Sequence, residues 1–383
     1  MIHVRRAHTC NMDDPEAATA ELLEQLALPS PPPARSVGLL FCYVDFLSQG
    51  VASRLCERLP FPVLGCTTMG SALPEAHDSL MLSLVVLSSE DHLFLAGVSE
   101  PLGQDVGGRL RRLYRRLSGS LPAKPCLMLA LAPDLPSLNG DLVTEVLSEA
   151  SGGAPLFGAV AVDTTTRNRN AQTFHNGVAW RDRLALLLIQ GPSRPSFFLR
   201  ALCGAPVDRE EAVVTAAQDN RVLGINHMPA VAYLEEIGLV RNGAYDTLFA
   251  IPFFLKPPNG PEVPHSCSAI GPDGALVFLS DVAVNSLLRF GLLTNDLVLE
   301  SADEMALAVR QAAAGRSLLL LFSCFSRSVA LKNPLEEMAL VRERMAGEAL
   351  PFLFAYAGGE FCPRPSGNRE NGFLQYSLAG CLI

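Results

Sequence analysis

Short, strongly apolar runs alternate with helical segments along this chain. In the first block, an apolar run at residues 37–44 is followed by a helical segment at 46–59 and a proline-led apolar run at 62–70. Two further apolar runs come at 80–87 and 93–98. Runs of this length, flanked by turn residues, are typical of buried strands. The block therefore predicts a strand, a helix and then three strands.

The same order recurs twice further along the chain. The second copy comprises residues 126–131, a helix at 142–150, a proline-led strand at 155–163, and strands at 184–189 and 197–202. The third comprises residues 318–324, a helix at 334–345, a proline-led strand at 351–360, and a final strand at 373–383. A strand–helix–strand unit of about 35 residues has the size of a βαβ motif. The extra strands require antiparallel pairing as well.

These patterns predict an α/β protein (mixed α+β). We expect repeated strand–helix–strand–strand modules that form mixed sheets flanked by helices, in two domains. Residues 1–36 are predicted to hold an N-terminal helix and a proline-rich linker. Residues 37–240 would form an N-terminal domain with two module copies, and residues 241–383 a C-terminal domain with the third.

The predicted N-terminal helix has a clear start signal. Asp14 followed by Pro15 fits an N-cap and a first helical position, and the helix is expected to run to about Leu26. The segment 29–35 is too rich in proline to continue it.

The charge and composition exclude some classes of partner. The formal net charge is −9, and 49% of the residues are hydrophobic against 18% charged. A nucleic-acid partner is not expected, since phosphate binding requires a basic surface. The apolar runs are far shorter than the ~20 residues of a membrane-spanning helix, so no membrane insertion is expected.

The ten cysteines are scattered without any CxxC pair. Several lie inside apolar runs, where a free thiol behaves as a small buried hydrophobe. This usage favours a reducing cytoplasm over a disulfide framework.

The ends of the proline-led strands carry a family resemblance. Residues 63–70, Val-Leu-Gly-Cys-Thr-Thr-Met-Gly, resemble the signature of the FIST N-terminal domain, and residues 214–230 resemble the end of that domain. The tail resembles the FIST C-terminal domain in four motifs: Ser323-Cys324-x-x-Arg327, Glu336-Glu337, Gly359-Glu360, and Asn371 before the last strand.

This resemblance implies a cytoplasmic sensory protein that binds a small molecule, with amino acids as the ligand class. It implies signalling to a separate output protein, such as a histidine kinase or a cyclic-di-nucleotide enzyme. One branch of the family binds haem and senses nitric oxide, so a haem-based sensor is the alternative function.

A candidate ligand site follows from the third copy. Arg327 and Glu360 come after two strands predicted to be neighbours, and α/β folds bind ligands at such an edge. Arg327 would offer a fork of donors and Glu360 an acceptor, with Ser323 adding a hydroxyl and Asn371 an amide. Gly359 would let a ligand approach the backbone. A structural ion pair between Arg327 and Glu360 is the alternative explanation.

The first copy offers a second group of candidates. Cys66, Thr67 and Thr68 would present a thiol and two hydroxyls to a ligand. Cys66 or Cys324 would be the nucleophile of an uncharacterised thiol-dependent enzyme, a second alternative, but no histidine obviously supplies a base. Residues 358–361 spell the diguanylate cyclase signature, yet no separate phosphate-binding pattern precedes them. We therefore expect no enzyme activity.

Metal and cofactor signals are weak. His265-x-Cys267 is a close pair of metal-ligand types, but no second pair completes four ligands, so no metal site is expected. For the haem alternative, His175, His227 and His265 are the candidate axial ligands. None stands in a recognisable haem motif, and no cofactor is expected.

Overall fold

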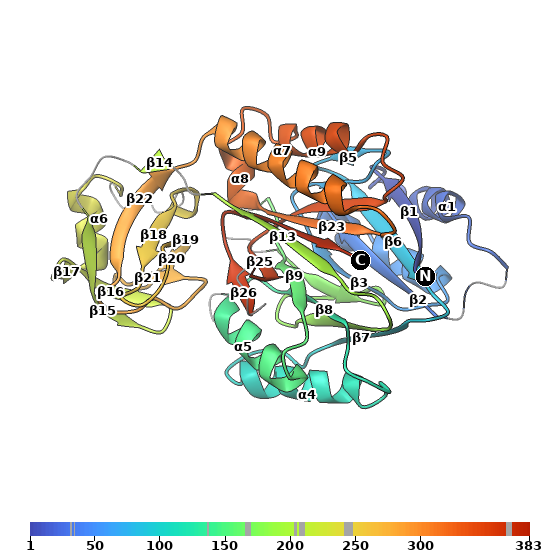
Figure 1. Ribbon diagram of the computed structural model, residues 1–383, viewed down its shortest axis with the longest axis horizontal. Coiled ribbons are helices and arrows are strands. Elements are labelled where there is room, and N and C mark those ends of the chain that lie inside the picture. The colour runs from blue at the N-terminus through green and yellow to red at the C-terminus, as the bar shows by residue number, and fades with distance from the viewer. Residues whose placement is uncertain are drawn as a thin grey trace.

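The computed structural model describes the chain except for residues 31–32, 34, 136–137, 165–169, 203–204, 207–210, 241–247 and 365–369. Its described part contains three six-stranded sheets and one nine-stranded sheet, with helices on the outer faces of the six-stranded sheets (Figure 1). The predicted class, an α/β protein with mixed sheets flanked by helices, is confirmed.

The first sheet has the order β1-β6-β2-β3-β10-β11. Its strands are β1 (His3–Thr9), β6 (Leu82–Ser88), β2 (Ser36–Cys42), β3 (Val63–Thr67), β10 (Thr173–His175) and β11 (Val178–Trp180). Strands β2 and β3 are parallel, and β6 runs antiparallel to β2. Its helices are α1 (Pro15–Leu26), α2 (Asp45–Ser48) and α3 (Val51–Arg58). Asp14 caps α1 by accepting hydrogen bonds from the backbone N–H groups of Glu16 and Ala17, as predicted.

The second sheet repeats this plan in the order β26-β25-β9-β8-β12-β7. Its strands are β26 (Asn371–Leu374), β25 (Glu360–Pro363), β9 (Leu156–Val160), β8 (Leu127–Ala132), β12 (Ala185–Gln190) and β7 (Leu93–Val98). Helices α4 (Val106–Ser118) and α5 (Gly140–Ser151) cover it.

The third sheet has the order β13-β27-β23-β24-β4-β5. Its strands are β13 (Ser196–Ala201), β27 (Ser377–Leu382), β23 (Leu319–Cys324), β24 (Phe352–Ala357), β4 (Ser71–Ala72) and β5 (His77–Asp78). Its helices are α7 (Asn295–Ala312), α8 (Phe325–Val329) and α9 (Glu336–Met345). The last strand predicted in each of the first two copies, β7 and β13, thus pairs into the following sheet instead.

The three sheets exchange hairpins in a closed ring. Hairpin β4–β5 follows β3 in the chain but pairs with β24. Hairpin β10–β11 follows β9 but pairs with β3, and β25–β26 follows β24 but pairs with β9. Each module therefore completes the sheet of another, and we expect the folding of all three to be coupled.

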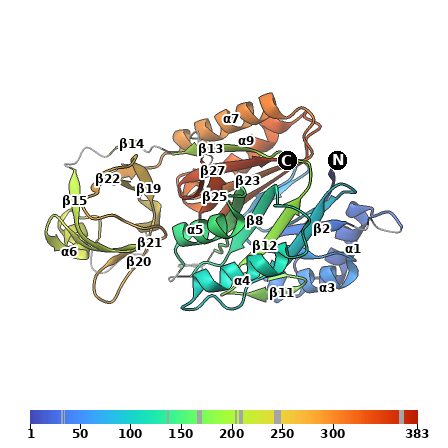
Figure 2. The same cartoon turned by 60° about the horizontal axis from the view of Figure 1, so that its bottom comes forward.

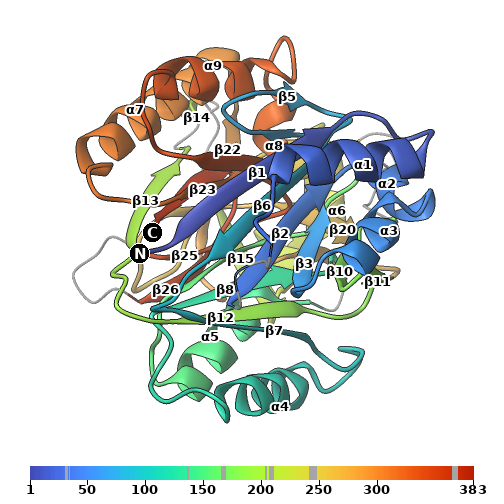
Figure 3. The same cartoon turned by 90° about the vertical axis from the view of Figure 1, so that its right-hand side faces the viewer.

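The inner faces of the three sheets share one apolar core. Phe322 of β23 lies at its centre, with ring centroids 5.3 Å from Phe41 of β2 and 5.1 Å from Phe157 of β9. The outer faces pack against their own helices in separate clusters. Figure 3 shows these helices on three sides of the sheets.

The nine-stranded sheet forms a separate unit beside this core (Figure 2). Its strands are β14 (Ala205–Pro206), β15 (Ala212–Gln218), β16 (Arg221–Ile225), β17 (Met228–Pro229), β18 (Phe253–Lys256), β19 (Val263–His265), β20 (Cys267–Ile270), β21 (Leu276–Phe278) and β22 (Leu287–Leu292). It also carries α6 (Ala230–Glu236) and a short 3-10 helix, η1 (Leu248–Ala250). The unit is inserted between β13 and α7.

The predicted domain boundary between residues 240 and 241 falls within this unit. Residue 241 begins the segment 241–247, which lies outside the described residues. The N-terminal segment 1–36 also contains β1, which the sequence did not predict.

Candidate functional site

A buried polar cluster surrounds Arg327, in α8 just after β23. Arg327 and Glu337, in the first turn of α9, are both fully buried, and Arg327 Nη2 lies 2.6 Å from Glu337 Oε1. Arg327 Nε donates to the same oxygen and to Ser323 Oγ, both at 3.1 Å. Ser323 Oγ in turn donates to Glu337 Oε2 at 2.9 Å. The buried charge of Arg327 is thus matched by one carboxylate.

The two terminal nitrogens of the Arg327 guanidinium, Nη1 and Nη2, differ in their hydrogen bonding. Arg327 Nη2 also reaches Ser301 Oγ at 2.9 Å and the Val298 carbonyl at 3.2 Å, both on α7. Arg327 Nη1, however, is buried and has no hydrogen-bond partner. A buried charged donor without a partner is costly, so this nitrogen is a place where a ligand or water atom would bind.

Glu360, the first residue of β25, is a second such group. It is fully buried; its Oε2 accepts a hydrogen bond from Ser377 Oγ at 2.5 Å, and its Oε1 has no partner. Burial raises the pKa of Glu360 well above its usual range, while the Ser377 hydrogen bond and the charge of Arg327 oppose that shift. The folded protein therefore holds the proton of this carboxyl to a higher pH than an exposed glutamate would.

The two strands that precede these residues are neighbours as predicted, but the ion pair between Arg327 and Glu360, the alternative explanation, does not form. Strands β23 and β24 are parallel neighbours with Cys324 opposite Ala357, so both end at one sheet edge. The ion-pair partner of Arg327 is Glu337, not Glu360. The reason is that Gly358 and Gly359 carry the chain away from β24 into the second sheet, where Glu360 pairs with Ala159.

Cys324 lies within the same cluster. Burial, together with the negative charge of the neighbouring Glu360, raises its pKa to about 12. The side chain is therefore a neutral thiol and a weak nucleophile near neutral pH.

Gly359 has a packing role. Its φ is +153°, and a Cβ there would lie 2.4 Å from the ring of Phe373. The glycine is therefore required by the aromatic ring that covers it.

Asn371 lies at the far end of the β25–β26 hairpin, opposite Pro363, whereas Glu360 is opposite Leu374. Its Oδ1 accepts from the Leu156 N–H at 2.8 Å, and its Nδ2 donates to the Ala154 carbonyl at 2.9 Å. Its side chain thus clamps the exchanged hairpin to the start of β9, and the structure does not bring it to Arg327.

The candidates of the first copy are engaged with the backbone. Thr67 Oγ1 accepts from the Gln172 N–H at 3.0 Å, and Thr68 Oγ1 lies 2.8 Å from the Tyr356 carbonyl. Burial raises the pKa of the Cys66 thiol. The two threonines therefore hold neighbouring segments together, Thr68 beside the end of β24, while Cys66 packs in the apolar core.

Sequence reasoning missed several members of the cluster. Glu337 was noticed only as part of a helix start, and Ser301 and Ser377 carried no motif at all. The sequence pattern that could have identified Glu337 is its position on the apolar face of α9, which also carries Met338 and Val341. A buried carboxylate on a helix face needs a cation, and Arg327 supplies it.

The inserted unit contacts the segment between β26 and β27 through Ser266, which follows His265 at the end of β19, and through Ile251. The backbone N–H of the next residue, Ser266, donates to Gln375 Oε1 at 2.6 Å, and Tyr376 OH donates to the Ile251 carbonyl at 3.0 Å. His265 Nδ1 is buried without a partner. Burial lowers the pKa of His265 to about 4, so its ring is neutral near pH 7.

The three candidate haem ligands lie on separate elements of the fold. His175 Nε2 and His265 Nδ1 are buried without a hydrogen-bond partner, so the surroundings of either nitrogen would have to open before it could bind an iron. His227 lies exposed on a turn with a left-handed φ of +64°, and its neighbour Asn226 is exposed too. Among the residues that the structure describes, no group of three or more His, Cys, Asp or Glu side chains is placed to hold a metal ion.

Comparison with known families agrees with this architecture. A model of the FIST N domain matches residues 36–228, and a model of the FIST C domain matches residues 229–363. The chain belongs to the FIST family, whose domains serve small-ligand sensing in signal transduction. A comparison with curated proteins finds no match. No helix of the described part of the chain is long and apolar enough to span a membrane.

Proposed function

We propose that this chain is a non-catalytic cytoplasmic sensor that binds a small polar ligand between Arg327 and Glu360 and signals to a separate protein. The observation that carries the proposal is the pair of unpartnered buried atoms, Arg327 Nη1 and Glu360 Oε1. One is a cationic donor and the other an acceptor, beside the ends of two parallel strands. A ligand with a carboxylate and an ammonium group, as in an amino acid, would satisfy both.

The thiols support a binding role over catalysis. Cys66 and Cys324 are buried, and burial raises the pKa of each far above neutral, so neither is present as a thiolate. The alternative of a thiol-dependent enzyme would require a low thiol pKa in an accessible position. The output partner is proposed to be a histidine kinase or a cyclic-di-nucleotide enzyme, as the family implies.

Thermal unfolding in the presence of individual amino acids tests the proposal. At least one amino acid should raise the midpoint of the natural protein, because a ligand that binds only the folded state stabilises it. Glu360→Gln should lose this response while keeping the Ser377 hydrogen bond. The matched control is Glu262→Gln, which makes the same chemical change at a carboxylate that pairs with Arg289 in the inserted unit.

A second variant separates binding from stability. Replacing Arg327 and Glu337 together by methionine removes the buried ion pair without leaving either charge alone, so the fold should survive. The ligand response should disappear, because Nη1 is gone. If both variants respond to amino acids like the natural protein, the proposed site is wrong.

A further inference from the structure

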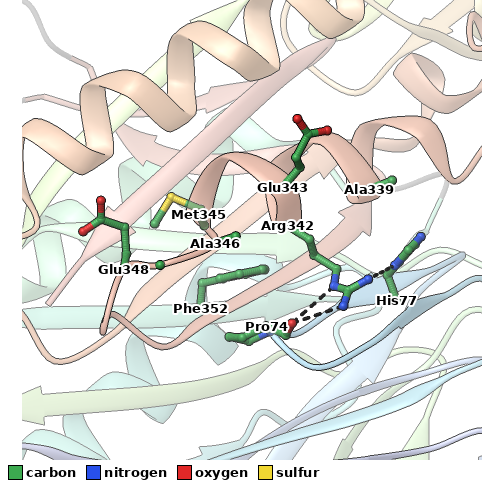
Figure 4. Close-up of a pocket in the computed structure, with 10 residues that line it drawn as sticks. Pro74, His77, Ala339, Arg342, Glu343, Met345, Ala346, Glu348 and Phe352 are labelled. Carbon is green, nitrogen blue, oxygen red and sulfur yellow. Dashed lines mark hydrogen bonds between the residues drawn. The ribbon is translucent and has the colours of Figure 1, made fainter.

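A groove lies on the far side of α9, where the exchanged hairpin β4–β5 packs against the third module (Figure 4). It has a volume of about 430 Å³, within the range of small-molecule sites. Pro74 and His77 line it from the hairpin segment, and Phe352 from the start of β24. The last turns of α9 form the remaining wall.

Arg342 of α9 is the cation of this groove. Its Nη2 donates to the carbonyls of Pro74 and Glu75 at 3.2 and 3.0 Å, and its Nη1 lies 2.6 Å from His77 Nδ1. Figure 4 shows the guanidinium between the Phe352 ring and His77. All these acceptors are neutral, since desolvation and the charge of Arg342 lower the pKa of His77.

The nearby acidic side chains are paired elsewhere. Glu348 binds Arg310 at 2.8 Å, and Glu343 binds Arg344 at 3.1 Å. Within the described part of the chain, no carboxylate lies within ion-pair distance of Arg342. The guanidinium therefore brings a positive charge to the groove that the protein leaves uncompensated, and Nη1 has a second N–H to donate.

We propose that this groove binds a small monocarboxylate with an apolar body, at a site separate from the Arg327–Glu360 cluster. The carboxylate would accept from Arg342 Nη1, since a guanidinium matches carboxylate geometry. The apolar body would lie along Phe352, Met345 and Ala346, which line the groove.

The charge of the groove suits a ligand with a single negative charge. Glu343 and Glu348 also line the groove but are paired with Arg344 and Arg310, so the one positive charge of Arg342 balances one carboxylate and not a dianion such as a phosphate monoester. A bound monocarboxylate would touch both Arg342 of the third module and the hairpin donated by the first. It would therefore stabilise one of the hairpin exchanges that close the ring.

Benzoate and its neutral isostere benzamide are suitable probes. Benzoate should show saturable binding in ligand-observed NMR and raise the thermal midpoint, whereas benzamide should bind at least tenfold more weakly, and inorganic phosphate should have no effect. Ala346→Trp fills the groove from an exposed position while keeping the Arg342 side chain, and should abolish benzoate binding. Arg342→Met should do the same, although it also removes the contacts to Pro74 and Glu75.

The two proposed sites are distinguishable in this experiment. Glu360→Gln should bind benzoate like the natural protein, and Ala346→Trp should keep the amino-acid response. Equal binding of benzoate and benzamide, or benzoate binding that survives in a folded Ala346→Trp protein, would overturn the carboxylate site. Benzoate binding lost in Glu360→Gln would place it in the other cluster and equally overturn the proposal.

Discussion

Arg327 Nη2 and Glu337 Oε1 lie 2.6 Å apart in an ion pair whose side chains are both fully buried. Because an unpaired charge in such a place is poorly solvated, removing one partner costs about 3–5 kcal/mol. Glu337→Ala should therefore lower the free energy of unfolding by about that amount in urea denaturation. Glu343→Ala on the same helix is the control; its side chain is 71% exposed, and the change should cost less than about 1 kcal/mol. Equal losses of unfolding free energy in the two variants would contradict a stabilising role of the buried ion pair.

Glu360 makes the stability of the unliganded protein depend on pH. Burial raises its pKa in the folded state well above the usual 4.5, so the folded state holds a proton that the unfolded state has released. Above pH 4.5 this group therefore lowers stability as the pH rises, until the folded carboxyl also ionises. Glu360→Gln cannot ionise, so its stability should exceed that of the natural protein by an amount that grows from pH 4.5 towards neutral. A constant difference across this range of urea titrations would contradict the raised pKa.

Asn371 is predicted to act on stability and not on ligand binding. Asn371→Ala leaves the buried N–H of Leu156 and the carbonyl of Ala154 without partners, which should cost about 2 kcal/mol. Asn333→Ala, at an exposed asparagine that accepts one backbone hydrogen bond, should cost less than about 1 kcal/mol. Amino-acid stabilisation should be retained in both. If amino-acid stabilisation is lost in Asn371→Ala but kept in Asn333→Ala, Asn371 takes part in ligand binding and the prediction is wrong.

Cutting the chain between residues 240 and 241 should not release an independent C-terminal piece. That piece would carry β23, β24 and β27, but its hairpin β25–β26 would lack β9, and its sheet would lack β13 and β4. We expect it to aggregate or to unfold without cooperativity in circular dichroism and size-exclusion measurements.

A variant in which a short linker replaces residues 203–293 lacks the inserted unit and should behave differently from the cut chain. All three six-stranded sheets stay complete, since β13 ends at Ala201 and α7 begins at Asn295, so cooperative unfolding should remain. A soluble, cooperatively folded piece 241–383 would disprove the coupling between modules.

The purified protein should be colourless. One ring nitrogen of each of His175 and His265 is buried, His227 is exposed on a turn, and none stands in a recognisable haem motif, so none is expected to ligate a haem iron. An absorption spectrum checks this directly. A strong Soret band with stoichiometric haem, lost on replacing one of these histidines, would favour the gas-sensor alternative.

Local patterns determined much of the fold. The Asp14–Pro15 start, the helix to Leu26 and the strand–helix–strand order of each module are readable from hydrophobic spacing and capping residues. These features depend on residues a few positions apart, which is why the sequence shows them directly. The chain segment around Arg327 and Glu360 was also found this way, because both follow apolar strands. The final strand predicted at residues 373–383 was wrong as a single strand, because β26 and β27 lie in different sheets.

Only the tertiary structure decided how the modules exchange hairpins and which carboxylate pairs with Arg327. The donated strands are short; β4 and β5 have two residues each, too few for any periodicity. Their partners lie far away in sequence, as with Ala72 and Phe354. The sequence gives no reason to prefer Glu337 or Glu360 as the partner of Arg327. The placement of α9 brings Glu337 to the guanidinium, and the path of the chain after β24 takes Glu360 into a different sheet. Contacts of this kind depend on backbone placement, which residue type alone does not specify.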